Sequence, residues 1–168
     1  MGSEMCIRDS SYTACMSESA VTRYHPVAVL LHWLLGLALV GIFALGLYMS
    51  DLPFSPERLK LYSWHKWAGI VVFTLSFLRL FWRLTHRPPA LPVAIEATMP
   101  GWQRLAHHAT HHGLYLLFFA VPLLGWAFSS AAGFPVVLFG LLPLPDFVPV
   151  NEGLADVLKE LHELSAFA

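Results

Sequence analysis

Three histidines in apolar, helix-like stretches are the residues of this chain best suited to chemistry. They are His32 in LLHWLLG, His65 in SWHKWAG and His162 in ELHELSA. An imidazole without a partner at membrane depth is costly, so such a histidine indicates a functional site. Four positions after each histidine the chain has a small residue: Gly36, Gly69 and Ala166. Because residues i and i+4 share a helix face, each small residue leaves room for a large flat group beside the imidazole, and haem is the cofactor that this pattern favours.

The composition places these histidines in a membrane protein. Of the 168 residues, 57% are hydrophobic and 12% are charged, whereas soluble domains carry about 25% charged residues. The formal net charge of −1 offers no basic surface for nucleic acid.

Residues 1–15 share neither composition nor periodicity with the rest of the chain. They lack the apolar central region of a signal peptide. We interpret them as a non-native or disordered tail and expect Met16 to be the native start, with a haem-binding transmembrane bundle over 16–168. Both cysteines, Cys6 and Cys15, lie in this tail. No Cys-x-x-Cys-His motif is present, so covalent haem attachment is not indicated.

Long apolar runs predict three membrane-spanning helices, since a span needs about 20 apolar residues. The expected ranges are 27–49, 57–84 and 102–131. No charged residue occurs between Tyr24 and Ser50. Ser55 followed by Pro56 has the form of a helix N-cap, and Pro122 lies inside the third range.

The remaining segments connect these helices. The stretch 86–92 is too rich in proline to be helical, and 133–151 contains four prolines that exclude a straight span, so we expect a re-entrant or interfacial loop there. A helical pattern restarts over 152–168. The predicted fold is an all-α integral membrane protein, a four-helix transmembrane bundle whose fourth helix is incomplete in this chain.

Charge predicts the orientation. The cations cluster before the first helix and around the loop between the second and third: Arg23, Arg79, Arg83, Arg87 and Arg104. Lys and Arg stay on the cytoplasmic side of membranes. The N-terminus and this loop are therefore expected to be cytoplasmic, and the other two loops to lie outside.

This orientation gives each histidine a depth. His65 and His162 lie near the outer ends of the second and fourth helices, so they can face one another at one level. Two opposed imidazoles fill both axial positions of a haem iron, which favours one-electron transfer over oxygen binding. His32 lies roughly 8 Å from the inner end and cannot join them. Its partner on the fourth helix would fall about 14 residues beyond His162, past the end of the chain.

Four further histidines occur at the inner end of the third helix: His107, His108, His111 and His112. They lie at a membrane depth similar to that of His32. One of them is therefore an alternative second ligand, with His32, for an inner haem. No small residue follows them at i+4, which favours proton handling, quinone contact or plain interfacial polarity.

The chain resembles the bacterial cytochrome b561 family, which also groups with the b-type cytochrome subunits of membrane-bound hydrogenases. The resemblance runs from about Tyr24 to the end. The residues that carry it are His32-Trp33, His65, Arg79-Leu80, Arg83-Leu84, Pro88-Pro89, Ala106-His107-His108, Tyr115 to Phe118, Pro122 with Gly125, Phe139-Gly140-Leu141, and His162-Glu163.

The resemblance implies a bacterial inner-membrane protein with two b haems, each between two histidines. It implies that His65 and His162 bind the outer haem. His32 would pair with a fourth-helix histidine that this sequence lacks. The iron ligands expected in this chain are thus His32, His65 and His162, with Gly36 and Gly69 beside the haems.

The function that follows is electron transfer between the quinone pool and a donor or acceptor at the periplasmic face. Alternatives are a superoxide:quinone oxidoreductase and a cytochrome anchor subunit of a hydrogenase-like complex with a periplasmic redox partner. A histidine-lined metal or proton pathway without haem is a fourth possibility. Whether the chain is an enzyme or an electron carrier is left open.

Overall fold

The structure, a computed structural model, describes residues 24–86 and 98–168. The described residues do not include the predicted tail 1–15 with its two cysteines or the predicted start at Met16. They also do not include Arg23, Arg87 and Pro88. The described elements are α1 (Pro26–Ser50), α2 (Pro56–Thr85), α4 (Gly101–Ala131), β1 (Val137–Leu138), β2 (Leu142–Pro143) and α5 (Glu152–Ala166).

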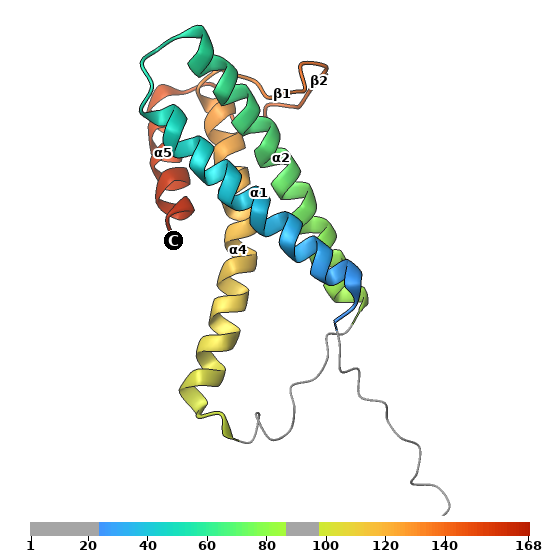
Figure 1. Cartoon of the computed structure of the whole chain (residues 1–168). Coiled ribbons are helices and arrows are strands. Elements are labelled where there is room, and N and C mark those ends of the chain that lie inside the picture. The colour runs from blue at the N-terminus through green and yellow to red at the C-terminus, as the bar shows by residue number, and fades with distance from the viewer. Residues whose placement is uncertain (1–23, 87–97) are drawn as a thin grey trace, which may run out of the picture.

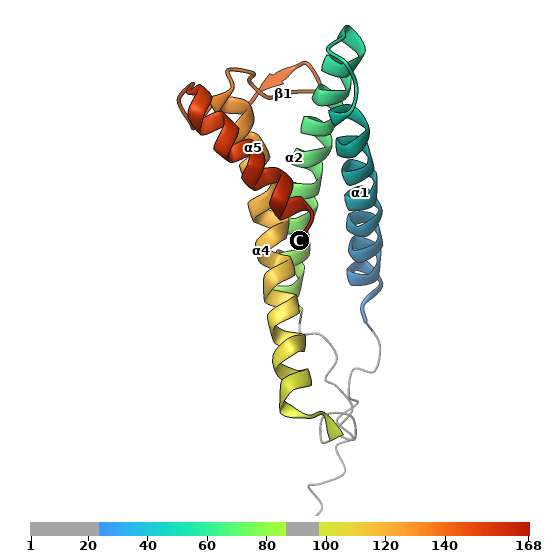
Figure 2. The same ribbon diagram turned by 90° about the vertical axis from the view of Figure 1, so that its left-hand side faces the viewer.

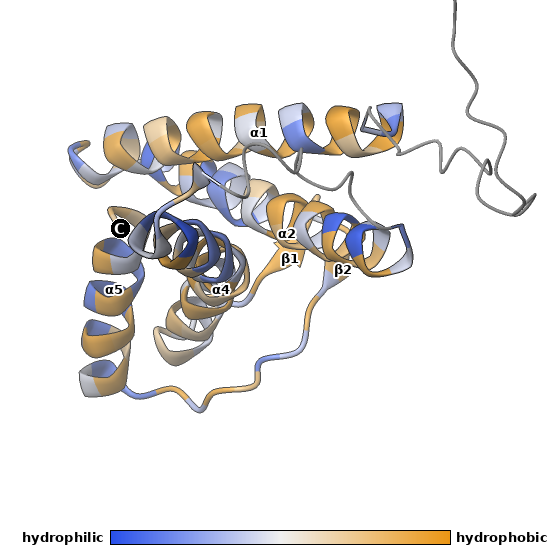
Figure 3. Ribbon diagram, turned by 90° about the horizontal axis from the view of Figure 1, so that it is seen from below, coloured by the Kyte–Doolittle hydropathy of each residue, from blue (hydrophilic) through white to orange (hydrophobic). Residues whose placement is uncertain are grey.

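Three helices are long and apolar enough to cross a membrane: α1, α2 and α4. They begin and end within one residue of the ranges expected from the sequence. Their large apolar side chains face outward. Leu37 and Val40 of α1, for example, are 68% and 70% exposed, and Figure 3 shows α1 mostly in the orange of hydrophobic residues. Such a surface is stable against lipid rather than water.

The fourth helix differs from these three. α5 has 15 residues, fewer than the roughly 20 that a span requires. The described fold is therefore mostly helical, with three membrane-capable helices and a shorter fourth. That α5 is part of a longer span stays a prediction.

Side-chain caps define where the helices begin. The Ser55 hydroxyl accepts from the backbone N–H of Arg58 at 3.2 Å, with Pro56 at the first helical position. Asn151 caps α5 in the same way, since its Oδ1 accepts from the N–H of Leu154 at 2.9 Å. Each cap satisfies a backbone donor that the first helical turn leaves without a partner.

The helices pack in a chain of neighbours. α1 packs on α2, α2 packs on α4, and α5 turns back along the C-terminal half of α4 (Figures 1 and 2). The end of α5 also reaches α1, where the rings of Phe43 and Phe167 meet edge to face with centroids 5.3 Å apart. α1 and α4 are thus each in contact with both α2 and α5, and α2 and α5 face one another across the bundle.

The segment between α4 and α5 contains a small antiparallel hairpin, which the all-helical expectation did not include. β1 pairs with β2 in the register Val137↔Pro143 and Leu138↔Leu142. Phe139 and Gly140 have positive φ angles of 53° and 72°, as a tight hairpin turn requires.

Two hydrogen bonds tie this hairpin segment to α2. The indole N–H of Trp67 donates to the carbonyl of Val137 at 2.7 Å, and Lys66 Nζ donates to the carbonyl of Phe134 at 2.9 Å. The hairpin segment therefore packs on the start of α2.

At the opposite end of the bundle, three rings join α1 to α2. Trp82 stacks on His86 with centroids 3.8 Å apart, and the ring of His25 lies 5.0 Å from Trp82. His25 also caps α1, because its Nδ1 accepts from the N–H of Val27 at 3.3 Å. These two exposed histidines at helix ends thus make structural contacts.

Candidate functional site

His65 of α2 and His162 of α5 face one another. Their ring centroids are 6.2 Å apart, and the ring planes are nearly perpendicular at 89°. The two residues are 97 positions apart in the chain, and the return of α5 along α4 brings them together. The pair lies in the half of the bundle that also holds the hairpin.

One nitrogen of His162 is committed to the backbone. Its Nδ1 lies 2.9 Å from the carbonyl oxygen of Val121 on α4. Since a carbonyl can only accept, Nδ1 carries the proton and the lone pair is on Nε2. A hydrogen bond of this kind fixes the orientation of a metal-binding histidine.

A glycine makes room for the His162 ring. A Cβ atom placed on Gly125 would lie 2.9 Å from Cε1 of His162 and 3.1 Å from its Nδ1. Real Cβ atoms essentially never approach so closely, so the ring can lie against α4 only because residue 125 has no side chain.

His65 is held in a similar way from the other side. A Cβ atom on Gly46 of α1 would lie 3.2 Å from its Cε1. Its Nδ1 is buried without a hydrogen bond of full geometry, and the ring interacts with the backbone of Ile42.

The spacing of the pair leaves room for one metal ion. The ring centroids are 6.2 Å apart, and a metal–imidazole bond is about 2 Å long. His65 and His162 would therefore hold a haem iron between them, and a haem bound by two imidazoles would supply one-electron transfer.

The small residues predicted beside the haems do not contact the two facing rings, and that they adjoin a haem stays a prediction. Gly69 faces α1, where a Cβ atom on it would lie 3.7 Å from Cδ1 of Ile42. A Cβ on Gly36 would meet nothing within 4 Å. The glycines that receive the histidine rings are Gly46 and Gly125 on the neighbouring helices. Both glycines are visible in the sequence, but periodicity alone does not say which glycine meets which ring.

His32 lies on the opposite half of α1 and contacts Arg79 of α2. Arg79 Nη1 and His32 Nδ1 are 2.8 Å apart. A guanidinium can only donate, so Nδ1 holds the lone pair and, in the neutral ring, Nε2 carries the proton. In this arrangement His32 does not present Nε2 to a metal. Its ring contact in the described part of the chain is with Trp33. Among the described residues His32 makes no ring contact with another histidine, so an inner haem at His32 stays a prediction.

The four histidines of α4 are exposed at its N-terminal end. They contact one another and not His32. His107 and His111 have ring centroids 4.3 Å apart, and those of His108 and His112 are 6.5 Å apart.

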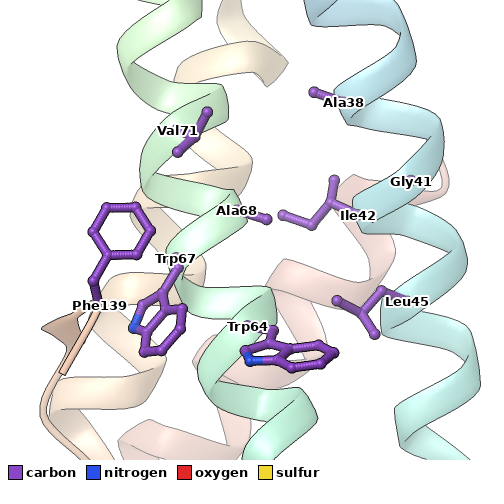
Figure 4. Close-up of a pocket in the computed structure, with 9 residues that line it drawn as sticks. All are labelled: Ala38, Gly41, Ile42, Leu45, Trp64, Trp67, Ala68, Val71 and Phe139. Carbon is purple, nitrogen blue, oxygen red and sulfur yellow. The ribbon is translucent and has the colours of Figure 1, made fainter.

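An apolar hollow of about 430 Å³ lies between α1 and α2. Its walls include Trp64 and Trp67 of α2 and Phe139 of the hairpin, opposite Gly41 and Ile42 of α1 (Figure 4). Three aromatic rings around an apolar space suit a flat, lipid-soluble ligand. Neither His65 nor His162 lines the hollow, although Trp64 directly precedes His65 in the chain.

Comparison with known proteins gives consistent matches. Residues 23–168 match the model of a family described as prokaryotic cytochrome b561. The chain is 34% identical over 147 residues to cytochrome b561 homolog 2 of Escherichia coli K12, covering 83% of this chain and 73% of the relative. It is 31% identical over 148 residues to a protein of Yersinia pestis named probable superoxide oxidase CybB, covering 86% and 78%. The resemblance predicted from the sequence is thereby confirmed.

Proposed function

Because the chain belongs to the prokaryotic cytochrome b561 family of membrane b-type cytochromes, we propose that His65 and His162 would hold a b haem. The protein would then transfer electrons between the quinone pool and a donor or acceptor at the periplasmic face. The observation that carries this proposal is the facing pair of imidazoles, 6.2 Å apart, each seated against a glycine of a neighbouring helix.

The residues around the pair have distinct tasks in this proposal. Val121 holds the Nδ1 proton of His162 and so keeps the Nε2 lone pair free for iron. Gly46 and Gly125 let the two rings lie close to α1 and α4. A haem bound by two histidines supplies one-electron transfer without an open site for oxygen. The apolar helices around it exclude water.

The orientation belongs to the same proposal. Arg79, Arg83 and Arg104 lie at the end of the bundle opposite the hairpin, and the positive-inside rule assigns that end to the cytoplasm. The His65–His162 pair then lies toward the periplasm of a bacterial inner membrane.

The hollow between α1 and α2 is our candidate for the quinone site. It is apolar and lined by aromatic rings. Small ligand sites commonly combine such walls with few polar groups. A quinone entering from the lipid would reach it without crossing a polar surface.

A difference spectrum tests the proposal. Membranes from cells that express the chain are oxidised with ferricyanide and reduced with dithionite. We expect the α-band of a b-type cytochrome, and the pyridine haemochrome of the purified protein should identify haem b. A purified, folded protein without either band would contradict the proposal.

A second candidate is oxidation of superoxide coupled to quinone reduction. The name of the Yersinia pestis relative favours it. Two superoxide ions each lose one electron and leave as O₂, and the two electrons with two protons convert a quinone to a quinol. Arg58 and Lys60 lie near the start of α2, at the proposed periplasmic end, where cations attract a small anion. Stopped-flow mixing with superoxide decides: the haem becomes reduced within milliseconds if this candidate holds, and stays oxidised if it does not.

A further inference from the structure

The N-terminal part of α4 extends beyond the rest of the bundle. A helix of 31 residues is about 46 Å long at 1.5 Å per residue, whereas the hydrocarbon layer is about 30 Å thick. The packed part of α4 is its C-terminal end, where Ala127, Ser129 and Ala131 are buried. The first turns therefore project past the ends of α1 and α2, as Figures 1 and 2 show in yellow, and are open to water and dissolved ions.

Four histidines occupy this projecting part as two overlapping i, i+4 pairs. Residues i and i+4 are neighbours on a helix surface, and two histidines at this spacing are a recurring metal-binding arrangement. The rings of His107 and His111 are already close, with centroids 4.3 Å apart and planes at 47°. Those of His108 and His112 are 6.5 Å apart. The first pair is thus nearer to the geometry of a chelate.

The backbone fixes the protonation of one ring in each pair. His111 Nδ1 donates to the carbonyl of His107 at 2.8 Å, and His112 Nδ1 donates to that of His108 at 2.7 Å. With the proton on Nδ1, each Nε2 carries a lone pair. This is the second-shell bond that orients histidine ligands in metal sites.

We propose that His107 and His111 form a binding site for a divalent transition-metal ion. The two imidazoles supply two ligands from one helix face, and water completes the coordination. Imidazole suits Cu²⁺, Ni²⁺ and Zn²⁺, with Cu²⁺ bound most tightly in the general order of stability. No Asp or Glu occurs between residues 98 and 131, and Arg104 lies one turn before the pair. The two ligands are therefore uncharged nitrogen atoms. The site favours metal ions that bind nitrogen over Ca²⁺ or Mg²⁺, which bind oxygen.

The test is calorimetric titration of the purified full-length protein, prepared in detergent and without a polyhistidine tag, with CuCl₂ and ZnCl₂. We expect one tight ion per chain. The double variant His107→Ala/His111→Ala should bind it at least about tenfold more weakly. The matched double variant His108→Ala/His112→Ala should retain it. Equal weakening in the two variants, or undiminished binding in the first, overturns the assignment, as does a wild-type protein that binds neither ion.

Copper also gives a spectroscopic readout. Electron paramagnetic resonance of the Cu²⁺-loaded protein should show superhyperfine splitting from imidazole nitrogen, and the His107→Ala/His111→Ala variant should lose it. The haem absorption spectrum should be the same in all three proteins. The metal site and the haem proposal therefore stand or fall separately, because neither His65 nor His162 is altered.

Discussion

The two facing histidines are held by different partners at the residue scale. His162 is oriented by a hydrogen bond to the carbonyl of Val121, whereas the His65 ring has only a weaker interaction with the backbone of Ile42. His65 is positioned instead by its helix and by the open space over Gly46. We therefore expect His162 to keep its orientation without a ligand and His65 to depend more on the bound group.

Loss of either imidazole should remove the haem. We expect His65→Ala and His162→Ala to abolish the b-type absorption band of the purified protein, because each leaves one axial position without a protein ligand. His86→Ala is the control, since His86 stacks on Trp82 at the other end of the bundle. A variant of either ligand that retained the full band would exclude that residue as a ligand.

Gly125 provides a test that leaves the ligand itself in place. In Gly125→Ala the new Cβ would lie 2.9 Å from Cε1 of His162, so the ring must move away from α4 and lose its bond to Val121. We expect the haem content to fall severalfold. Gly113→Ala in the same helix is the matched control, because a Cβ there meets nothing within 4 Å. Equal haem content in the two variants would show that the close contact between the His162 ring and Gly125 is not needed for haem binding.

At the scale of elements, α5 is the helix on which the site depends. It carries His162, has 15 residues and packs mainly on α4. Short helices are marginal in isolation and are stabilised by packing and by their caps. The stability of α5 should therefore control how well His162 is presented.

The cap of α5 can be removed without touching the site. Asn151→Ala deletes the acceptor of the Leu154 N–H, which costs about 1 kcal/mol. We expect haem to be released at a lower temperature in a melt followed at the Soret band. Lys159→Ala is the control on the same helix, since its exposed ion pair with Glu163 spans 3.8 Å and contributes little. A melt of Asn151→Ala that matches that of the control would show that the cap does not limit the site.

The arrangement of the whole molecule follows from its surroundings. Side chains such as Leu37 and Val40 are mostly exposed, so the three long helices gain little from a buried core and are stable only within a lipid layer. Polar and ring contacts join the elements at both ends, in the hairpin segment and around Trp82. The two ends of the bundle therefore differ, and which of them faces the periplasm stays a prediction.

Labelling of single cysteines tests which end is outside. With Cys6 and Cys15 replaced by serine, we expect Phe54→Cys, in the loop between α1 and α2, to react with a membrane-impermeant maleimide in intact spheroplasts. Gln103→Cys, at the start of α4, should react only after the membrane is permeabilised. Phe54 is 82% exposed, so access is not limited by the fold. The reverse pattern would invert the proposed orientation.

The hollow between α1 and α2 gives a prediction about quinone. A Cβ on Gly41 meets nothing within 4 Å, and Gly41 lines the hollow, so Gly41→Leu should fill part of it without disturbing the helices. We expect the KM for a soluble quinol to rise about tenfold or more while the haem spectrum is unchanged. Gly113→Leu adds the same side chain to open space on α4 and should leave the KM as it was. An unchanged KM in Gly41→Leu would place the quinone elsewhere.

Much of this protein was determined locally and could be predicted. The ranges of α1, α2 and α4 follow from uninterrupted apolar runs, and the start of α2 follows from Ser55 and Pro56. The expectation that His65 faces His162 needed only the helix order and the direction of each span. The family resemblance rested on residues in their order along the chain, and the comparisons confirmed it.

The tertiary structure alone decided which residues surround the site. That Gly46 and Gly125 receive the two rings, that Gly69 instead meets Ile42, and that Arg79 contacts His32 all depend on how the helices are rotated against one another. The hairpin over α2 depends on donors from Lys66 and Trp67 about 70 residues away. Helical periodicity fixes which side chains share a face, because it is a property of one helix. Which face meets which neighbouring helix is set by packing between helices. The periodicity of a single helix therefore does not predict these contacts.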